Sequence, residues 1–191
     1  MKKIKFLASS LVFSLLLLLL GGCLTSYSGP ADSTPIVVIG DSLVDQASNE
    51  IKFFYSLDSS YKYSVNGFGG ITTCYARDDI REGVSMSPAV LVIALGTNDK
   101  TLGWDINNFL CMSDILNNIT RNVDVLWIVP NHGGPEVRSV LEYWDRPNVT
   151  IGGWDEVSND PSYYIYDGIH HTTKGRVAYA AFIVQQSINL L

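Results

Sequence analysis

The chain has 191 residues, of which 47% are hydrophobic and 17% charged, and its formal net charge at pH 7 is −6. This length suits one domain with a substantial core and excludes two domains of ordinary size once the first residues are set aside. Once the first residues are set aside, the rest of the chain is acidic and has no basic cluster, which argues against nucleic acid as a partner and against electrostatic docking on anionic lipid.

The first residues have the order of a secretion signal. Three lysines among the first five residues precede an uncharged, mostly apolar run over 6–20, and "LGGC" follows, ending at Cys23. The run is shorter than the roughly 20 apolar residues of a membrane-spanning helix. A cleaved signal peptide over 1–22 is therefore favoured over a transmembrane anchor. Its removal would take the net charge from −6 to −9, since three lysines and no acidic residue are lost.

"LGGC" also resembles the bacterial lipobox, in which the cysteine is lipidated and becomes the first residue of the mature protein. This resemblance implies acyl chains on Cys23 and stable membrane attachment through them. The protein would then be an exported, extracytoplasmic bacterial lipoprotein, on the periplasmic face of the outer membrane if the cell is Gram-negative. The alternative is a buried or disulfide-bonded Cys23. Residues 24–34 are mostly small or polar, so 23–34 is predicted to be a lipidated, flexible tether and 35–191 the folded domain.

From residue 35 onward, short apolar runs alternate with longer amphipathic segments. The pattern predicts, in chain order, a strand at 35–40, a helix at 42–57, a strand at 62–67, a helix at 72–86, a strand at 89–96, a helix at 106–121, a strand at 123–130, a helix at 136–144, a strand at 148–154 and a helix at 172–191. This alternation predicts a parallel sheet of about five strands with helices on both faces. The functional site of such a sheet lies beyond the carboxyl ends of its strands.

Ser42 stands where the first predicted strand leads into the first predicted helix. A hydroxyl at this position can be a nucleophile, because the backbone N–H groups of a helix N-terminus stabilise developing negative charge. Ser and Asp are also common helix N-caps, so Ser42 or its neighbour Asp41 can instead have a capping role.

A serine nucleophile needs a base, and His170 is placed to provide one. It stands in a loop before the last predicted helix, three residues after Asp167. This spacing lets the carboxylate fold back on the imidazole, which fixes its tautomer and supports the cation that forms when it takes a proton. The pair alone is equally consistent with a loop hydrogen bond.

Donors for an oxyanion are predicted in two further loops. "NGFGGIT", after the second strand, contains Gly69 and Gly70, whose backbone N–H groups can approach a ligand closely. "LGTNDK", after the third strand, contains Asn98, a side-chain amide donor. A glycine-rich turn and an asparagine cap are the alternatives. All these loops are expected at one edge of the sheet, which favours a common site.

The blocks "GDSL" (40–43), "GFGGIT" (67–72), "GTND" (96–99) and "DGIH" (167–170) together resemble the four blocks of the SGNH, or GDSL-type, hydrolases. They occur in the family's order, and the resemblance covers nearly everything from residue 35 to the C-terminus. It implies a flavodoxin-like three-layer α/β/α sandwich and serine esterase chemistry that needs no cofactor.

The same resemblance implies a role for each residue of the blocks. Ser42 would be the nucleophile, His170 the general base and then the general acid, and Asp167 its orienting partner. The oxyanion hole would consist of the backbone N–H groups of Ser42 and Gly70 and the side-chain amide of Asn98. The reaction would be ester hydrolysis through an acyl-enzyme.

Two positions depart from the family's pattern. Ile71 follows Gly70 where an aspartate is more usual, and Gly70 is still preferred to Gly69 because of the residues that follow it. His171 stands where many relatives have proline, and we expect it at the rim of the site. Two adjacent histidines can also suggest a metal, but no Glu, Asp or Cys stands at supporting ligand spacing, so no metal site is predicted.

The loops between the blocks are short, which leaves little chain for a lid or a deep acyl tunnel and favours an open site for short acyl groups. Trp104, Trp144 and Trp154 can stack on a sugar if they are exposed, or belong to the core. His132, after the fourth strand, is either a substrate contact or a plain loop residue. We expect a small acyl ester or an acylated glycan as substrate, foremost an acetyl ester on carbohydrate or cell-envelope glycan.

Other functions stay open at the level of sequence. A lysophospholipase or lipid esterase is the second choice, and an O-acyltransferase would use the same residues. A catalytically inert, lipid-tethered binding protein would keep the fold without turnover. Cys74 and Cys111 either form a disulfide, which an oxidising compartment favours, or are two small buried hydrophobic residues. The oligomeric state is not predicted.

Overall fold

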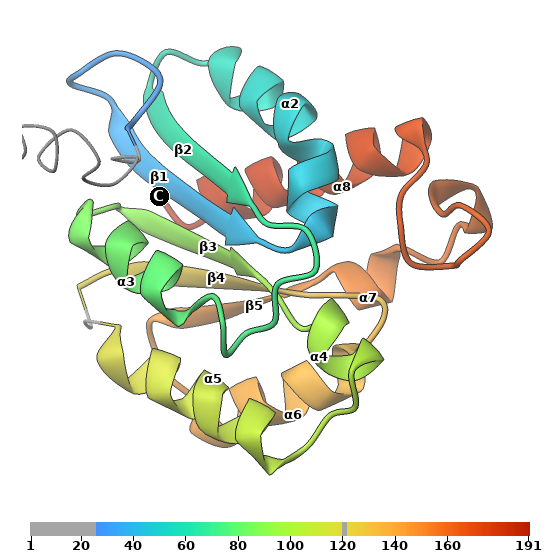
Figure 1. Ribbon diagram of the computed structural model, residues 1–191. Coiled ribbons are helices and arrows are strands. Elements are labelled where there is room, and N and C mark those ends of the chain that lie inside the picture. Colours follow the sequence, from blue (N-terminus) through green and yellow to red (C-terminus); the bar gives the residue numbers. More distant parts are fainter. Residues whose placement is uncertain (1–25, 120–121) are drawn as a thin grey trace, which may run out of the picture.

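The computed structural model describes residues 26–119 and 122–191. The expected signal peptide (1–22) and the expected lipidation site, Cys23, lie outside these residues. Five parallel strands form one sheet with helices on both faces (Figure 1). They are β1 (Thr34–Gly40), β2 (Tyr61–Gly67), β3 (Val90–Ala94), β4 (Asp124–Val129) and β5 (Val149–Gly153), in the order β2-β1-β3-β4-β5. The predicted flavodoxin-like three-layer α/β/α fold is confirmed.

The register of the sheet brings the carboxyl ends of three neighbouring strands level. Gly40, the last residue of β1, is paired with Gly67 of β2 and with Ala94 of β3. In Figure 1 the arrowheads point toward α4 (Thr97–Thr101), α7 (Trp154–Val157) and the loop before α8 (Thr173–Ile188). The segments that follow these strands therefore begin side by side at one edge of the sheet.

The two helical layers follow from the amphipathic segments of the sequence. The helices α2 (Ser42–Ser56), α7 and α8 cover one face, and α3 (Arg77–Ser85), α5 (Ile106–Asn118) and α6 (Gly134–Trp144) cover the other. The short helix α4 and the 3-10 helix η1 (Pro161–Tyr163) lie in loops. Sequence periodicity does not predict α4, α7 or η1, because segments of three to five residues are too short to show it.

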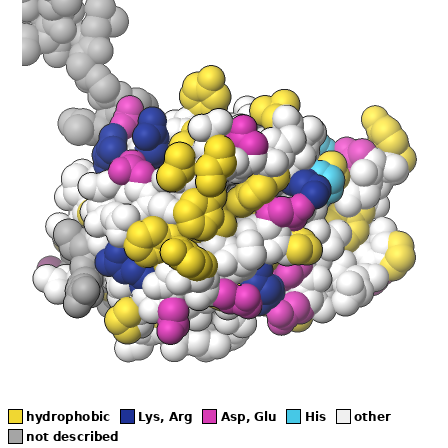
Figure 2. Space-filling view, turned by 90° about the horizontal axis from the view of Figure 1, so that it is seen from below, with side chains coloured by type: hydrophobic (Ala, Val, Ile, Leu, Met, Phe, Trp, Pro, Cys, Tyr) yellow, Lys and Arg dark blue, Asp and Glu magenta, His cyan; other side chains and the backbone are white. Residues whose placement is uncertain are grey.

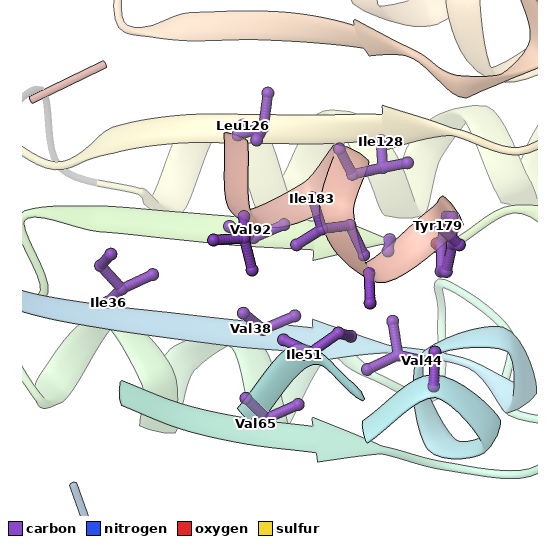
Figure 3. Close-up of a cluster of buried hydrophobic side chains, with 14 of the residues drawn as sticks. Ile36, Val38, Val44, Ile51, Val65, Val92, Leu126, Ile128, Tyr179 and Ile183 are labelled. Carbon is purple, nitrogen blue, oxygen red and sulfur yellow. The ribbon is translucent and has the colours of Figure 1, made fainter. Parts of the chain in front are cut away.

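The central strands are buried on both faces, so their side chains alternate between two cores. Ile36 and Val38 of β1 face α2 and α8, whereas Val37 and Ile39 face the layer of α3, α5 and α6. Figure 3 shows the first of these cores, where Ile183 of α8 meets the strand side chains. Burial on both faces explains the unbroken apolar runs of the strands and gives the loops at their ends a rigid base.

The described part of the expected tether lies against the domain. Ser28 forms an antiparallel bridge with Tyr63 of the edge strand β2, with both backbone hydrogen bonds at 2.8 Å. The hydroxyl of Tyr27 donates to the backbone oxygen of Met86 at 3.1 Å. These contacts partly cover the open edge of β2, and they order residues that the composition alone assigned to a flexible segment.

A disulfide joins Cys74 to Cys111, with their Cα atoms 5.2 Å apart. It ties the segment before α3 to α5, so the first of the two alternatives for these cysteines is realised.

Figure 2 shows one face of the molecular surface, where Lys and Arg side chains lie next to Asp and Glu and hydrophobic side chains gather across the middle. Across residues 26–119 and 122–191, no helix has the length and apolar character needed to cross a bilayer.

Candidate active site

Ser42 begins α2 directly after β1, and its hydroxyl is not used to cap the helix. The N-cap is Asp41, whose Oδ1 accepts a hydrogen bond from the backbone N–H of Leu43 at 3.0 Å. Gly40 makes this sharp turn possible, since a Cβ there would lie 2.2 Å from a methyl group of Val44. The Ser42 Oγ is left to face His170, and its distance to Nε2 is 3.2 Å.

His170 is held by Asp167 in the loop before α8. Its Nδ1 lies 2.7 Å from Asp167 Oδ2, while Asp167 Oδ1 accepts the backbone N–H groups of Ile169 and His170, each at 2.9 Å. The hydrogen bond from the imidazole, followed by those from the backbone, lowers the pKa of Asp167 to about 2. An ionised Asp167 keeps the proton on Nδ1, which leaves Nε2 as the acceptor that faces the Ser42 hydroxyl.

The glycine block and Asn98 lie in adjoining segments at the same edge. The backbone N–H of Phe68 donates to the oxygen of Gly40 at 3.0 Å, which joins the start of the glycine block to the end of β1. Asn98, in the first turn of α4, donates its side-chain amide to the oxygen of Ile71 at 2.9 Å. Gly70 has φ +74°, in the left-handed region that favours glycine, and a Cβ there would meet open space.

A buried carboxylate beneath this loop was not singled out from the sequence. Asp99 accepts the backbone N–H of Thr73 at 3.0 Å and its hydroxyl at 2.8 Å, and it accepts the side-chain amide of Asn108 at 2.6 Å. It therefore fastens the segment after Gly70 to α4. The adjacency of Asp99 to Asn98 was the only available sequence signal, because its partners lie elsewhere in the chain.

Asp41 is the second buried carboxylate of the site. Burial raises its pKa to about 6, and the negative charge of Asp99 acts in the same direction, while the hydrogen bond from Leu43 opposes it. Asp41 lies 1% exposed directly beside Ser42. Its charge therefore depends on pH close to neutrality, and it forms part of the electrostatic surroundings of the Ser42 hydroxyl.

The expectation that His171 lies at the rim is wrong. Its side chain is buried, and its ring lies 4.9 Å from that of Tyr179 and 5.7 Å from that of Trp154, measured between centroids. Neither ring nitrogen has a hydrogen-bond partner among the described residues. Burial, followed by the charges of His170 and Arg176, lowers the pKa of His171 to about 4, so the ring is neutral at pH 7.

The tryptophans are not free platforms at the rim. Trp154 is buried, whereas Trp104 and Trp144 are half-buried against the core of the second face. The indole N–H of Trp144 also donates to Ser113 Oγ at 2.8 Å. His132 is half-buried in the loop before α6.

The predicted site residues lie together at the strand ends. Ser42, His170 and Asp167 form a connected series, and Asn98 and Gly70 lie in the neighbouring loops. A surface hollow between α3 and α5, lined by Ile80, Val84 and Ile115 among others, contains none of these residues. The arrangement has what acyl transfer requires: a hydroxyl, an oriented base, and amide donors near a helix N-terminus.

This chain is similar in structure to several solved proteins. The sequence matches no protein-family model and has no significant match among curated proteins. The acetylxylan esterase Axe2 from Geobacillus stearothermophilus is 14% identical and superposes with a TM-score of 0.61, over 83% of this chain and 94% of that one.

Two further solved structures are similar in the same way. One is the catalytic domain of peptidoglycan O-acetyltransferase A from Streptococcus pneumoniae, with 19% identity and a TM-score of 0.63 over 83% of this chain and 97% of that one. The other is LAE5, an alpha/beta hydrolase enzyme from the metagenome of Lake Arreo, with 13% identity and a TM-score of 0.63 over 85% of this chain and 98% of that one. At such low identity, the likeness establishes a shared fold.

Proposed function

We propose that this protein is a serine esterase of the SGNH type that removes short acyl groups, foremost acetyl, from carbohydrate or cell-envelope glycan. The observation that carries the proposal is the series from Ser42 Oγ through His170 to Asp167, with distances of 3.2 and 2.7 Å. Its three members come from the two ends of the domain. Their meeting at the carboxyl edge of the sheet, beside a helix N-terminus, supports a catalytic role over capping.

In the proposed mechanism, Ser42 Oγ attacks the ester carbonyl carbon while His170 Nε2 takes the hydroxyl proton. The negatively charged carbonyl oxygen accepts hydrogen bonds from the N–H groups of Ser42 and Gly70 and from the side-chain amide of Asn98. The carbon–oxygen bond to the leaving alcohol then breaks, and His170 gives the proton to that alcohol. Water, deprotonated by His170, attacks the acyl-enzyme; the bond from the acyl carbon to Ser42 Oγ breaks, His170 returns the proton to Ser42 Oγ, and the carboxylic acid is released. Asp167 stabilises the imidazolium in both steps.

Two observations support a short acyl group on a glycan. The sequence leaves little chain between its four blocks for a lid or a deep apolar tunnel, so we expect an open site, which suits a bulky polymer better than a long acyl chain. Two of the structural neighbours are named as an acetylxylan esterase and a peptidoglycan O-acetyltransferase. A lysophospholipase or lipid esterase is the alternative that an acyl-chain length series would reveal.

Acyl transfer to a sugar is a second candidate function, because one structural neighbour is named as a peptidoglycan O-acetyltransferase. Hydrolysis and transfer share the same acyl-enzyme and differ in whether water or a sugar hydroxyl attacks it. Addition of acceptor oligosaccharides, with detection of acylated product, distinguishes the two.

We further propose that Cys23 is lipidated and tethers the enzyme to the membrane outside the cytoplasm. Mass spectrometry of the purified chain would detect the acyl groups.

The decisive experiment measures the rate at which the full chain, in detergent, hydrolyses p-nitrophenyl acetate and longer p-nitrophenyl esters. The Ser42→Ala variant is expected to lose about a thousandfold or more in kcat. Equal activity of the wild type and the variant would reduce Ser42 to a structural residue. If both are inactive on aryl esters and on acetylated glycans, the inert binding protein becomes the better hypothesis.

A further inference from the structure

Tyr166 is the most exposed of the large hydrophobic side chains in the described part of the chain. Its side chain is 99% exposed, compared with 81% for Tyr75 and 72% for Tyr143. No ring contact or hydrogen bond of its side chain is seen within residues 26–119 and 122–191. A tyrosine in this position adds nothing to the core, so the stability of the fold does not explain it.

The backbone that carries Tyr166 is nevertheless fixed. The N–H of Gly168 donates to the oxygen of Ile165 at 3.0 Å, which closes a turn with Tyr166 at its first corner. The N–H of Ile165 donates to the oxygen of His170 at 2.8 Å, and Asp167 Oδ1 accepts the backbone N–H groups of Ile169 and His170. Tyr166 is therefore attached to the same hydrogen-bonded loop that orients the catalytic imidazole.

This presentation suits recognition of a partner with a flat apolar face. A tyrosine on a fixed backbone has only two side-chain torsions to order, so it offers a large rigid contact area at a low entropic cost. A polar ligand with one apolar face, such as a sugar ring, can stack on the phenol while its hydroxyls stay in water. Tyr166 adjoins Asp167 in the chain, so its ring is carried by the loop that holds His170 Nε2 at 3.2 Å from Ser42 Oγ.

The surroundings favour a sugar over a lipid chain. The same loop carries Asp160, whose carboxylate forms an exposed ion pair with Lys174 at 2.7 Å, and Ser162 bonds to both. An acyl chain needs a continuous apolar groove, whereas a single aromatic ring among polar groups is what a carbohydrate contact requires. Within residues 158–172 the only large hydrophobic side chain exposed beside Tyr166 is that of Ile165, at 39%, which is too little apolar surface for an acyl groove.

We propose that Tyr166 is a specificity-determining residue, on which a sugar ring of the acylated glycan stacks while its ester faces Ser42. This inference rests on the proposed esterase function and adds the residue that selects carbohydrate esters over simple ones. The stacking contact acts in binding of the glycan and is absent for an ester without a sugar.

The test compares two substrates with the full chain in detergent: an acetylated oligosaccharide from xylan or peptidoglycan, and p-nitrophenyl acetate. Tyr166→Ala should lower the ratio of kcat/KM for the oligosaccharide to kcat/KM for the aryl ester about tenfold, mainly through KM. Tyr166→Trp should keep the ratio, because the flat ring is retained. Tyr143→Ala is the matched control, an exposed tyrosine near the far end of α6, and it should leave the ratio unchanged.

Binding gives a readout that does not need turnover. In the Ser42→Ala background, calorimetric titration with the acetylated oligosaccharide should show about tenfold weaker affinity after Tyr166→Ala. An unchanged ratio and affinity would overturn the proposal, as would a wild type that cleaves only the aryl ester. Equal losses on both substrates would instead make Tyr166 a support for Asp167, and a changed sedimentation coefficient would make it a subunit contact. Failure of the esterase proposal itself is recognised separately, by wild type and Ser42→Ala being equally active on p-nitrophenyl acetate.

Discussion

His171 makes the stability of this fold depend on pH. Burial, aided by the charges of His170 and Arg176, lowers the pKa of His171 from 6.5 to about 4. Between these two values the unfolded chain binds more protons than the folded one. The contribution of the neutral ring is therefore fully present above pH 6.5 and is lost as the pH falls toward 4. Acidification should weaken the packing under the loop that carries Asp167.

The magnitude follows from the two pKa values. A fall from 6.5 to about 4 corresponds to about 3 kcal/mol of unfolding free energy, which is a large share of the total for a domain of this size. Asp41 acts in the opposite direction, because burial raises its pKa to about 6 and its contribution is lost as the pH rises from its ordinary value of 3.8 through 6. The pKa values of the neighbouring Tyr164 and Tyr179 are raised by burial and lie far above this window. The contribution of His171 to the unfolding free energy is therefore obtained by comparing the wild type with a variant that lacks this histidine.

The variant His171→Phe keeps a flat ring and removes two buried nitrogens that have no partner among the described residues. At pH 7 its stability should equal or exceed that of the wild type. Urea unfolding at pH 4, 5, 6 and 7 should show the wild type losing about 3 kcal/mol more than this variant on going to pH 4. Parallel losses in the wild type and in His171→Phe would refute the reasoning.

Two further predictions concern the loop that carries Gly70. Asp99→Ala removes the acceptor shared by Thr73 and Asn108, so urea unfolding should show a loss of about 3 kcal/mol, and kcat for p-nitrophenyl acetate should fall as the loop moves. A less stable variant with an unchanged kcat would separate Asp99 from the site. Reduction of the Cys74–Cys111 disulfide, whose cysteines are 37 residues apart, should cost about 4 kcal/mol in the same assay, and an unchanged urea midpoint would contradict this.

Local sequence patterns determined the framework and the location of the site. The apolar runs at 35–40 and 123–130 predicted strands that are observed as β1 and β4, because strands covered on both faces leave no position for a polar side chain. The alternation of strands and helices implied a parallel sheet, whose loops meet at one edge. This was enough to bring Ser42 and His170 together from 128 positions apart in the chain.

Only the tertiary structure decided the features that depend on contacts between distant segments. Capping by Asp41, which frees the Ser42 hydroxyl, required the geometry of one turn, and the Cys74–Cys111 bond required the approach of the segment before α3 to α5. The burial of His171 and the full exposure of Tyr166 are opposite outcomes within one loop. Neighbours along the chain do not distinguish them, because the exposure of a side chain is set by which other elements pack over it.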